Sequence, residues 1–121
     1  MNMVGRLMAA KAKKICVFRF EGYVEETVGK ELKARYKNEW DQGTRQYLFD
    51  FSKTTLINSI ALSELLEIVS DSIGEPEVML YISQIPEKCY WGLSSLGLLH
   101  HMTEFTSFEQ AARELGLNNE E

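Results

Sequence analysis

The stretch "YLFDFSKTTLINSIALSELL" holds the residues with the most capacity for chemistry, because polar side chains there follow an apolar strand and precede a helix. Asn58 is a preferred residue for the N-cap of a helix, where its side chain accepts hydrogen bonds from backbone N–H groups. Ser59 would then take the first helical position with an exposed hydroxyl. A phosphate there would be stabilised by the helix N-terminus and would add almost two negative charges. These residues predict either a simple helix cap or a modifiable surface.

Motifs typical of catalysis are absent from the sequence. It contains no GxxxxGK[ST], no GxGxxG and no GxSxG. Asp50 lies near the expected end of a strand, but a receiver-type phosphoacceptor also needs an acidic pair after the first strand, where only Glu21 stands. His100 and His101 would point about 100° apart on a helix, so we expect them at a helix end and not at a metal. We predict no catalytic residue, no metal site and no cofactor.

The first half of the chain predicts two strands and two helices. "ICVFRF" and "QYLFDF" are apolar runs of β-forming residues, and the second reads as a strand covered on both faces. Between them, residues 25–40 have helical periodicity, and Gly43 ends the segment. Its apolar stripe consists of Val28, Leu32, Tyr36 and Trp40. A second amphipathic helix follows Ser59, with a stripe of Leu62, Leu65, Leu66, Val69 and Ile73.

The second half repeats the alternation. "VMLYIS" predicts a strand, and "KCYWGLSSLGLLHH" a helix weakened by Gly92 and Gly97. A short strand is expected at residues 102–105. The last helix is expected between a capping box, formed by Ser107 and Gln110, and a stop at Gly116. Alternating strands and helices predict an α/β domain whose central strands are mostly parallel, with the Asn58–Ser59 loop at the sheet edge where binding usually occurs.

Composition limits the classes of function. The chain has 121 residues, 45% hydrophobic content and a net charge of -5, as expected of one globular domain. The acidic balance argues against nucleic-acid binding and against docking on an anionic membrane. No apolar run reaches membrane-spanning length, and the opening residues lack the features of a signal peptide. We expect a cytoplasmic protein in which Cys16 and Cys89 are reduced core thiols.

The segment "YLFDFSKTTLINSIALSELLEIV" resembles the signature of STAS domains, the sulfate transporter and anti-sigma factor antagonist family. Asp50-Phe51-Ser52 is similar to the family's Asp-Leu-Ser, and residues 57–61 occupy the positions of Ile-Asp-Ser-Ser-Gly. "WGLSSLGLLHHMTEFTSFEQAARELG" is similar to its closing pattern. The resemblance implies a mixed, mostly parallel sheet of four or five strands packed with helices. We expect the domain at residues 15–117, an N-terminal extension or edge strand at 1–14, and a tail at 118–121.

The resemblance implies a bacterial regulatory domain without enzymatic activity. Antagonists of this family bind a serine kinase that is also an anti-sigma factor, and phosphorylation of the second motif serine releases it. Here that position is Ile60, the motif aspartate is Asn58 and the glycine is Ala61. Because Ile60 has no hydroxyl, the usual switch cannot operate at this position.

Several interpretations follow from these departures. The domain acts as a constitutive antagonist, Ser59 is a displaced phosphorylation site, or the module serves a transport or other complex without phosphorylation. A small-ligand site with Thr55, Asn58 and Ser59 is a further alternative. For a protein partner, the predicted contacts are Asn58, Ser59, Ile60, Ala61 and Ser63, with Ile60 either a contact or a core residue. A homodimer is possible.

Overall fold

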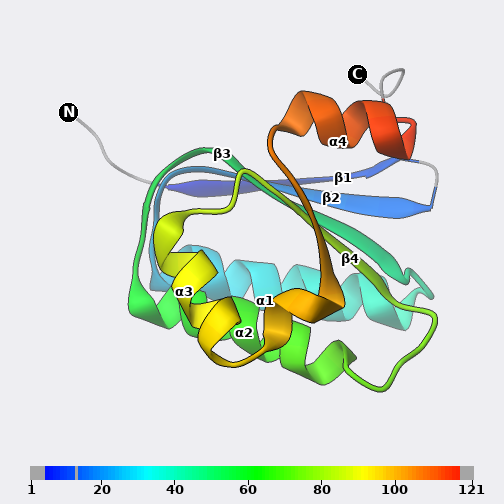
Figure 1. The fold of residues 1–121 in the computed structure, drawn as a ribbon, viewed down its shortest axis with the longest axis horizontal. Coiled ribbons are helices and arrows are strands. Elements are labelled where there is room, and N and C mark those ends of the chain that lie inside the picture. Colours follow the sequence, from blue (N-terminus) through cyan, green and yellow to red (C-terminus); the bar gives the residue numbers. More distant parts are fainter. Residues whose placement is uncertain (1–4, 13, 118–121) are drawn as a thin grey trace.

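The computed structural model describes residues 5–12 and 14–117, which form one five-stranded sheet and its covering helices (Figure 1). The strand order is β1-β2-β3-β4-β5; β1 pairs antiparallel with β2, and the other neighbours are parallel. The strands are β1 Arg6–Ala12, β2 Ile15–Val24, β3 Gln46–Ile57, β4 Met79–Ser83 and β5 Met102–Phe105. The predicted α/β class with a mixed, mostly parallel sheet is confirmed.

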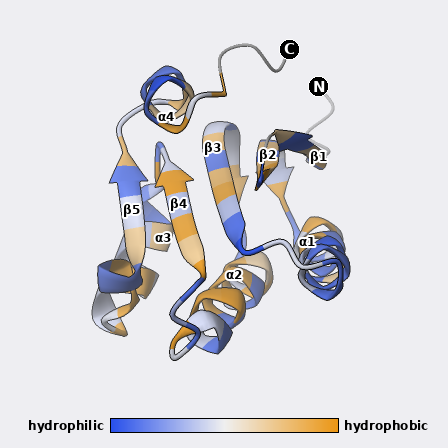
Figure 2. Cartoon of the chain, turned by 90° about the vertical axis from the view of Figure 1, so that its right-hand side faces the viewer, coloured by the Kyte–Doolittle hydropathy of each residue, from blue (hydrophilic) through white to orange (hydrophobic). Residues whose placement is uncertain are grey.

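Helices cover both faces of the sheet, as Figure 2 shows. One face carries α1 Glu26–Asp41, α2 Ser59–Ser72 and α3 Glu87–Ser95. A short 3-10 helix, η1 Leu98–His101, follows α3, and α4 Phe108–Leu115 packs on the opposite face. Of the segments outside the described residues, 1–4 and 13 belong to the predicted N-terminal extension, and 118–121 is the predicted tail. The strand β1 forms an edge of the same sheet.

Two hydrophobic layers hold these elements together. The layer under α1 to α3 contains stacked aromatic rings from neighbouring strands, such as Phe20 on Phe51 with ring centroids 4.6 Å apart. The smaller layer under α4 contains Leu48, Tyr81 and Phe105. Cys16 and Cys89 are free, buried thiols, and burial raises the pKa of each to about 12. The prediction of core thiols is confirmed.

Local signals in the sequence mark most element ends correctly. Gly43 and Gly116 take positive φ angles just after α1 and α4, the conformation that glycine adopts without steric cost. The Ser107 hydroxyl accepts a hydrogen bond from the N–H of Gln110, as the predicted capping box requires. The Gln110 side chain accepts from the N–H of Thr106 and not from that of Ser107. The predicted weak helix is divided by Gly97 into α3 and η1.

Candidate functional site

The strand β3 positions the candidate site and is longer than its sequence suggests. It continues from Asp50 through Ser52 to Ile57, because the second half of β2 pairs with it as far as Val24. Asp50 therefore lies inside a strand, and its predicted place near a strand end is wrong. The polar residues after Asp50 are not a loop but the exposed end of an extended strand.

Asp50 is a buried residue whose carboxylate is held by hydrogen bonds inside the molecule. Its side chain is 1% exposed and accepts hydrogen bonds from Arg19 Nε at 2.9 Å and from Ser83 Oγ at 2.6 Å. Ser52 Oγ also donates to it at 2.9 Å, and the Arg19 guanidinium lies 3.6 Å from the ring centroid of Phe108 on α4. These partners satisfy a buried carboxylate and connect three strands with α4. The role of Asp50 is structural, and a burial this complete leaves no access for phosphoryl transfer.

Helix α2 begins where the sequence predicts. Asn58 is its N-cap, with the side-chain oxygen accepting from the N–H of Ala61 at 2.8 Å. The backbone N–H of Asn58 donates to the carbonyl of Val24, which fixes the cap to the end of β2. From α3, Lys88 Nζ lies 3.4 Å from the carbonyl oxygen of Ile57 and donates to it. The junction between β3 and α2 is thus hydrogen-bonded to the end of β2 and to α3.

The side chains of this first turn are largely exposed. Ser59 occupies the first helical position and is exposed, as predicted. Ile60 is 45% exposed, so it is not a core residue. Ser63, one turn later, is also exposed, and its hydroxyl donates to the carbonyl of Ser59 at 2.9 Å. An exposed isoleucine between two serines gives this turn an apolar centre with polar surroundings.

Ala61 requires a correction, because it is 2% exposed and its side chain is unavailable to a partner. It packs against Gly29 of α1 so closely that a Cβ on that glycine would lie 2.8 Å from the Cα of Ala61. Ile73 also departs from its predicted place in the buried stripe, since it follows the end of α2 and is 44% exposed. Helical periodicity specifies neither the close contact of Ala61 with α1 nor the residue at which α2 ends.

Sequence reasoning missed other exposed apolar residues. Leu56, the second-last residue of β3, is 55% exposed. Trp91 in α3 and Leu96 at the end of that helix are each 62% exposed. The available signal for Leu56 was its place beside Ile57, because successive strand residues point to opposite faces and only one of the two can face the core. Leu56 stands two residues before the N-cap Asn58, so it and Ile60 are two exposed large apolar side chains in the sequence around the start of α2, a candidate interaction surface.

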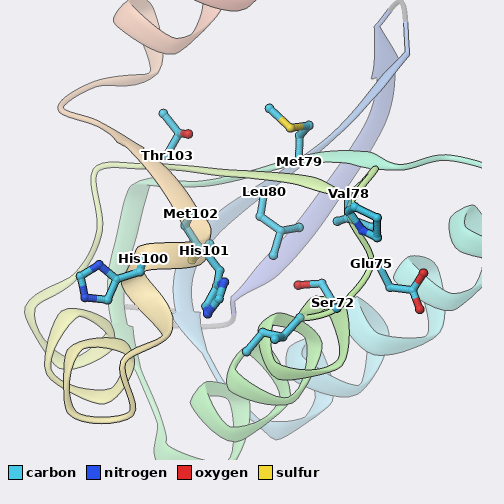
Figure 3. A pocket seen from close by; sticks show the side chains of 12 residues that line it. Ser72, Glu75, Val78, Met79, Leu80, His100, His101, Met102 and Thr103 are labelled. Atoms are coloured by element: carbon cyan, nitrogen blue, oxygen red, sulfur yellow. The ribbon is translucent and has the colours of Figure 1, made fainter.

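The histidines lie at the other end of α2 from Asn58. His100 and His101 end η1 and line a hollow of about 510 Å³ beside the end of α2 and the start of β4 (Figure 3). Their predicted place at a helix end is confirmed. Within residues 5–12 and 14–117, no group of three or more His, Cys, Asp or Glu side chains is arranged to hold a metal ion. No helix of that part of the chain has the length and apolarity needed to cross a bilayer.

Comparison with solved structures identifies the fold as that of STAS domains. The phosphorylated form of SpoIIAA, a Bacillus cell fate determinant, aligns with a TM-score of 0.73 at 14% identity, covering 88% of this chain and 97% of the other. RsbS from Moorella thermoacetica aligns with a TM-score of 0.70 at 14% identity, covering 96% and 99%.

A sulfate transporter family protein from Wolinella succinogenes has the same fold, with a TM-score of 0.65, 14% identity and 93% of each chain covered. No protein-family model and no curated protein matches the sequence. The STAS fold predicted from the Asp50–Ala61 motif is therefore confirmed by structure, at identities that establish the fold alone.

Proposed function

We propose that this protein is a non-enzymatic regulatory interaction domain, similar to anti-sigma factor antagonists, that binds a kinase-like anti-sigma factor through residues 58–73. The supporting observation is Ile60, a large apolar side chain 45% exposed at the start of α2. Exposing an isoleucine side chain to water is unfavourable, and a partner that covers it would remove that cost. The interaction takes place in the bacterial cytoplasm.

Binding by this surface is constitutive under the proposal. Ile60 stands where the resemblance places the phosphorylated serine, and it has no hydroxyl to modify. A phosphate at the centre of an interface would bring two negative charges that lose their water without gaining a partner. An isoleucine there keeps the interface permanently apolar. The partner is therefore captured without release by phosphorylation at this position.

Co-purification with a candidate anti-sigma kinase tests the proposal. The variant Ile60→Glu should abolish capture, because it places a charge at the centre of the contact. Ala34→Glu adds the same charge on the exposed face of α1 and should leave capture unchanged. Circular dichroism of both variants checks the fold. Equal capture by the wild type and Ile60→Glu would remove this surface from the proposal.

Ser59 provides an internal test of the constitutive mechanism. The wild type and Ser59→Ala are incubated with the kinase and ATP, and phosphopeptides are identified by mass spectrometry. The proposal expects no phosphate on Ser59 and the same capture before and after ATP. A phosphate on Ser59 that releases the partner would replace the constitutive mechanism with a displaced switch.

A second candidate function is a role in a transport complex. The observation favouring it is the structural match to the Wolinella sulfate transporter family protein. The identity of the neighbouring genes distinguishes the two: an anti-sigma kinase gene favours the antagonist, and transporter genes favour the transport module.

For a ligand at Thr55, Asn58 and Ser59, a thermal-shift screen with nucleotides, lipids and metabolites should give no increase in melting temperature under our proposal.

A further inference from the structure

A groove runs along the solvent side of α2. It has a volume of about 670 Å³ and lies between α2 and the segment that connects α3 with η1. Its apolar lining comes from Leu66 and Ile73 on one side and from Leu96 and Leu98 on the other. Leu96 is 62% and Ile73 is 44% exposed, whereas Leu66 is partly buried and Leu98 is buried, so each wall has one strongly exposed apolar side chain. Exposed apolar area of this kind is characteristic of an interaction site.

The spacing of small and large residues along α2 suits another helix. On the α2 side of the groove, the small residues Ser63 and Ser70 lie on either side of Leu66 in the sequence, and Ile73 follows just beyond the end of the helix. Small residues between large ones create notches into which the side chains of a second helix can pack. The 14 residues of α2 rise about 20 Å at about 1.5 Å per residue, which matches a partner helix of about four turns.

The charge around the groove is negative. Glu64 and Glu67 line it, and no Lys, Arg or His is among its lining residues. Lys33 of α1 is shared between them, with Nζ 2.6 Å from Glu67 and 3.6 Å from Glu64. Glu64 Oε1 is buried and has no hydrogen-bond partner among the described residues. The lining of the groove thus carries two carboxylates and no cation, while the lysines near them belong to α1, and a cationic partner would complement this lining.

We infer that the α2–η1 groove binds an amphipathic helix of the partner protein, with an apolar stripe flanked by Lys or Arg. This inference rests on the proposed function and names the structural element that the partner would contribute. The apolar stripe covers Leu66, Ile73 and Leu96, and the basic flank lies beside Glu64 and Glu67. The mode is that of a helix in a hydrophobic groove, where anchors recur at three- and four-residue spacing.

Fluorescence anisotropy with synthetic peptides tests the chemistry. Three labelled peptides of about 18 residues, long enough to form an isolated helix, are titrated with the full chain. One has a Leu stripe flanked by Lys, one the same stripe flanked by Glu, and one the Lys composition in scrambled order. The Lys-flanked helix should bind about tenfold or more tightly than either control at low salt. Added salt should narrow its advantage over the Glu peptide. Equal affinities, or no binding in the millimolar range, would overturn the inference.

Matched variants separate the groove from general attraction to an acidic protein. Ser70→Arg places a long cationic side chain in the groove and should reduce binding of the Lys-flanked peptide about tenfold or more. Ala34→Arg changes the net charge equally on α1 and should leave binding within about twofold. The same loss in both variants, or in neither, would show that the groove is not the site.

The pull-down assay distinguishes failure of this inference from failure of the proposed function. If Ile60→Glu loses the partner while Ser70→Arg retains it, the start of α2 binds and the groove inference is wrong. If both variants lose the partner and Ala34→Arg retains it, both conclusions are supported. If neither variant loses the partner, binding takes place outside residues 58–73 and both site assignments are wrong. If the wild type captures no candidate anti-sigma kinase, the proposed function itself is wrong.

Discussion

The helices α1 and α2 lie side by side on the same face of the sheet, yet their solvent-facing surfaces differ (Figure 1). The exposed side of α1 carries ion pairs at four-residue spacing, namely Glu26–Lys30, Glu31–Arg35 and Lys37–Asp41. The sequence of α2 contains three acidic residues and no Lys or Arg. The ion pairs of α2 are those of Glu64 and Glu67 with Lys33 of α1, and exposed isoleucines stand at its first turn, Ile60, and just beyond its end, Ile73.

The difference indicates which of the two helix surfaces is stable when exposed to water. The charged side of α1 is solvated and its charges are largely balanced, so it needs no partner. The outward side of α2 combines exposed apolar area with unbalanced negative charge. Because both helices bury a similar apolar stripe against the sheet, packing within the domain does not explain the contrast. Under the proposed function, binding to another protein explains the contrast, and the following variants test this comparison.

The largest effect is expected at the contact that the two helices share. Ala61→Leu should destabilise the domain by about 1–3 kcal/mol, because Gly29 leaves no space for a larger side chain. Ala34→Leu, on the exposed side of α1, should change the free energy of unfolding by less than about 0.5 kcal/mol. Urea denaturation followed by circular dichroism measures both. Similar values for the two variants would mean that α2 can move away from α1 at little cost.

The helix caps should give the next largest difference. Asn58→Ala removes the side-chain oxygen that accepts from Ala61 and should cost about 1 kcal/mol. Glu25 occupies the corresponding position of α1 but makes no side-chain capping hydrogen bond, so Glu25→Ala should have little effect. Thermal unfolding of both variants tests the contrast. A larger loss for Glu25→Ala would contradict the assignment of Asn58 as the stabilising cap.

Sequence reasoning succeeds where the signal is local. The cap at Asn58 and the apolar stripe of α1 depend on residues a few positions apart, and their spacing predicted both. The ion pairs of α1, Glu26–Lys30 and Glu31–Arg35, likewise join residues four positions apart. The five-strand sheet followed from alternating element types and from the resemblance at the Asp50–Ala61 motif.

Long-range contacts account for what the sequence did not reveal. The length of β3 beyond Asp50 is determined by pairing with β2, whose bulges let its second half continue alongside. Burial of Ala61 depends on Gly29, which lies 32 positions earlier on another helix (61 minus 29). The acidic groove needs α2 and η1 together. Such features arise only when elements distant in the chain meet.

Ile60→Glu should have a smaller effect on stability, and one of opposite sign. The first turn of α2 has no acidic residue, and a carboxylate there interacts favourably with the helix dipole. The variant should therefore be more stable than the wild type by about 0.3–1 kcal/mol. On α1, Glu26→Gln should lose a comparable amount. A more stable protein that no longer captures its partner would show that the isoleucine is retained for binding. A destabilised Ile60→Glu would instead assign it a structural role.

The smallest effect is expected on the charged side of α1. Glu31→Gln removes one carboxylate of the Glu31–Arg35 pair, whose atoms are 3.0 Å apart, and should cost no more than about 0.5 kcal/mol. Thermal unfolding at low and high salt measures this cost, which should vanish as salt screens the wild-type pair. A loss above 1 kcal/mol that persists in high salt would mean that the ion pairs hold α1 in place. A small, salt-sensitive loss would mean that these charges mainly keep α1 solvated, which is the property that α2 lacks.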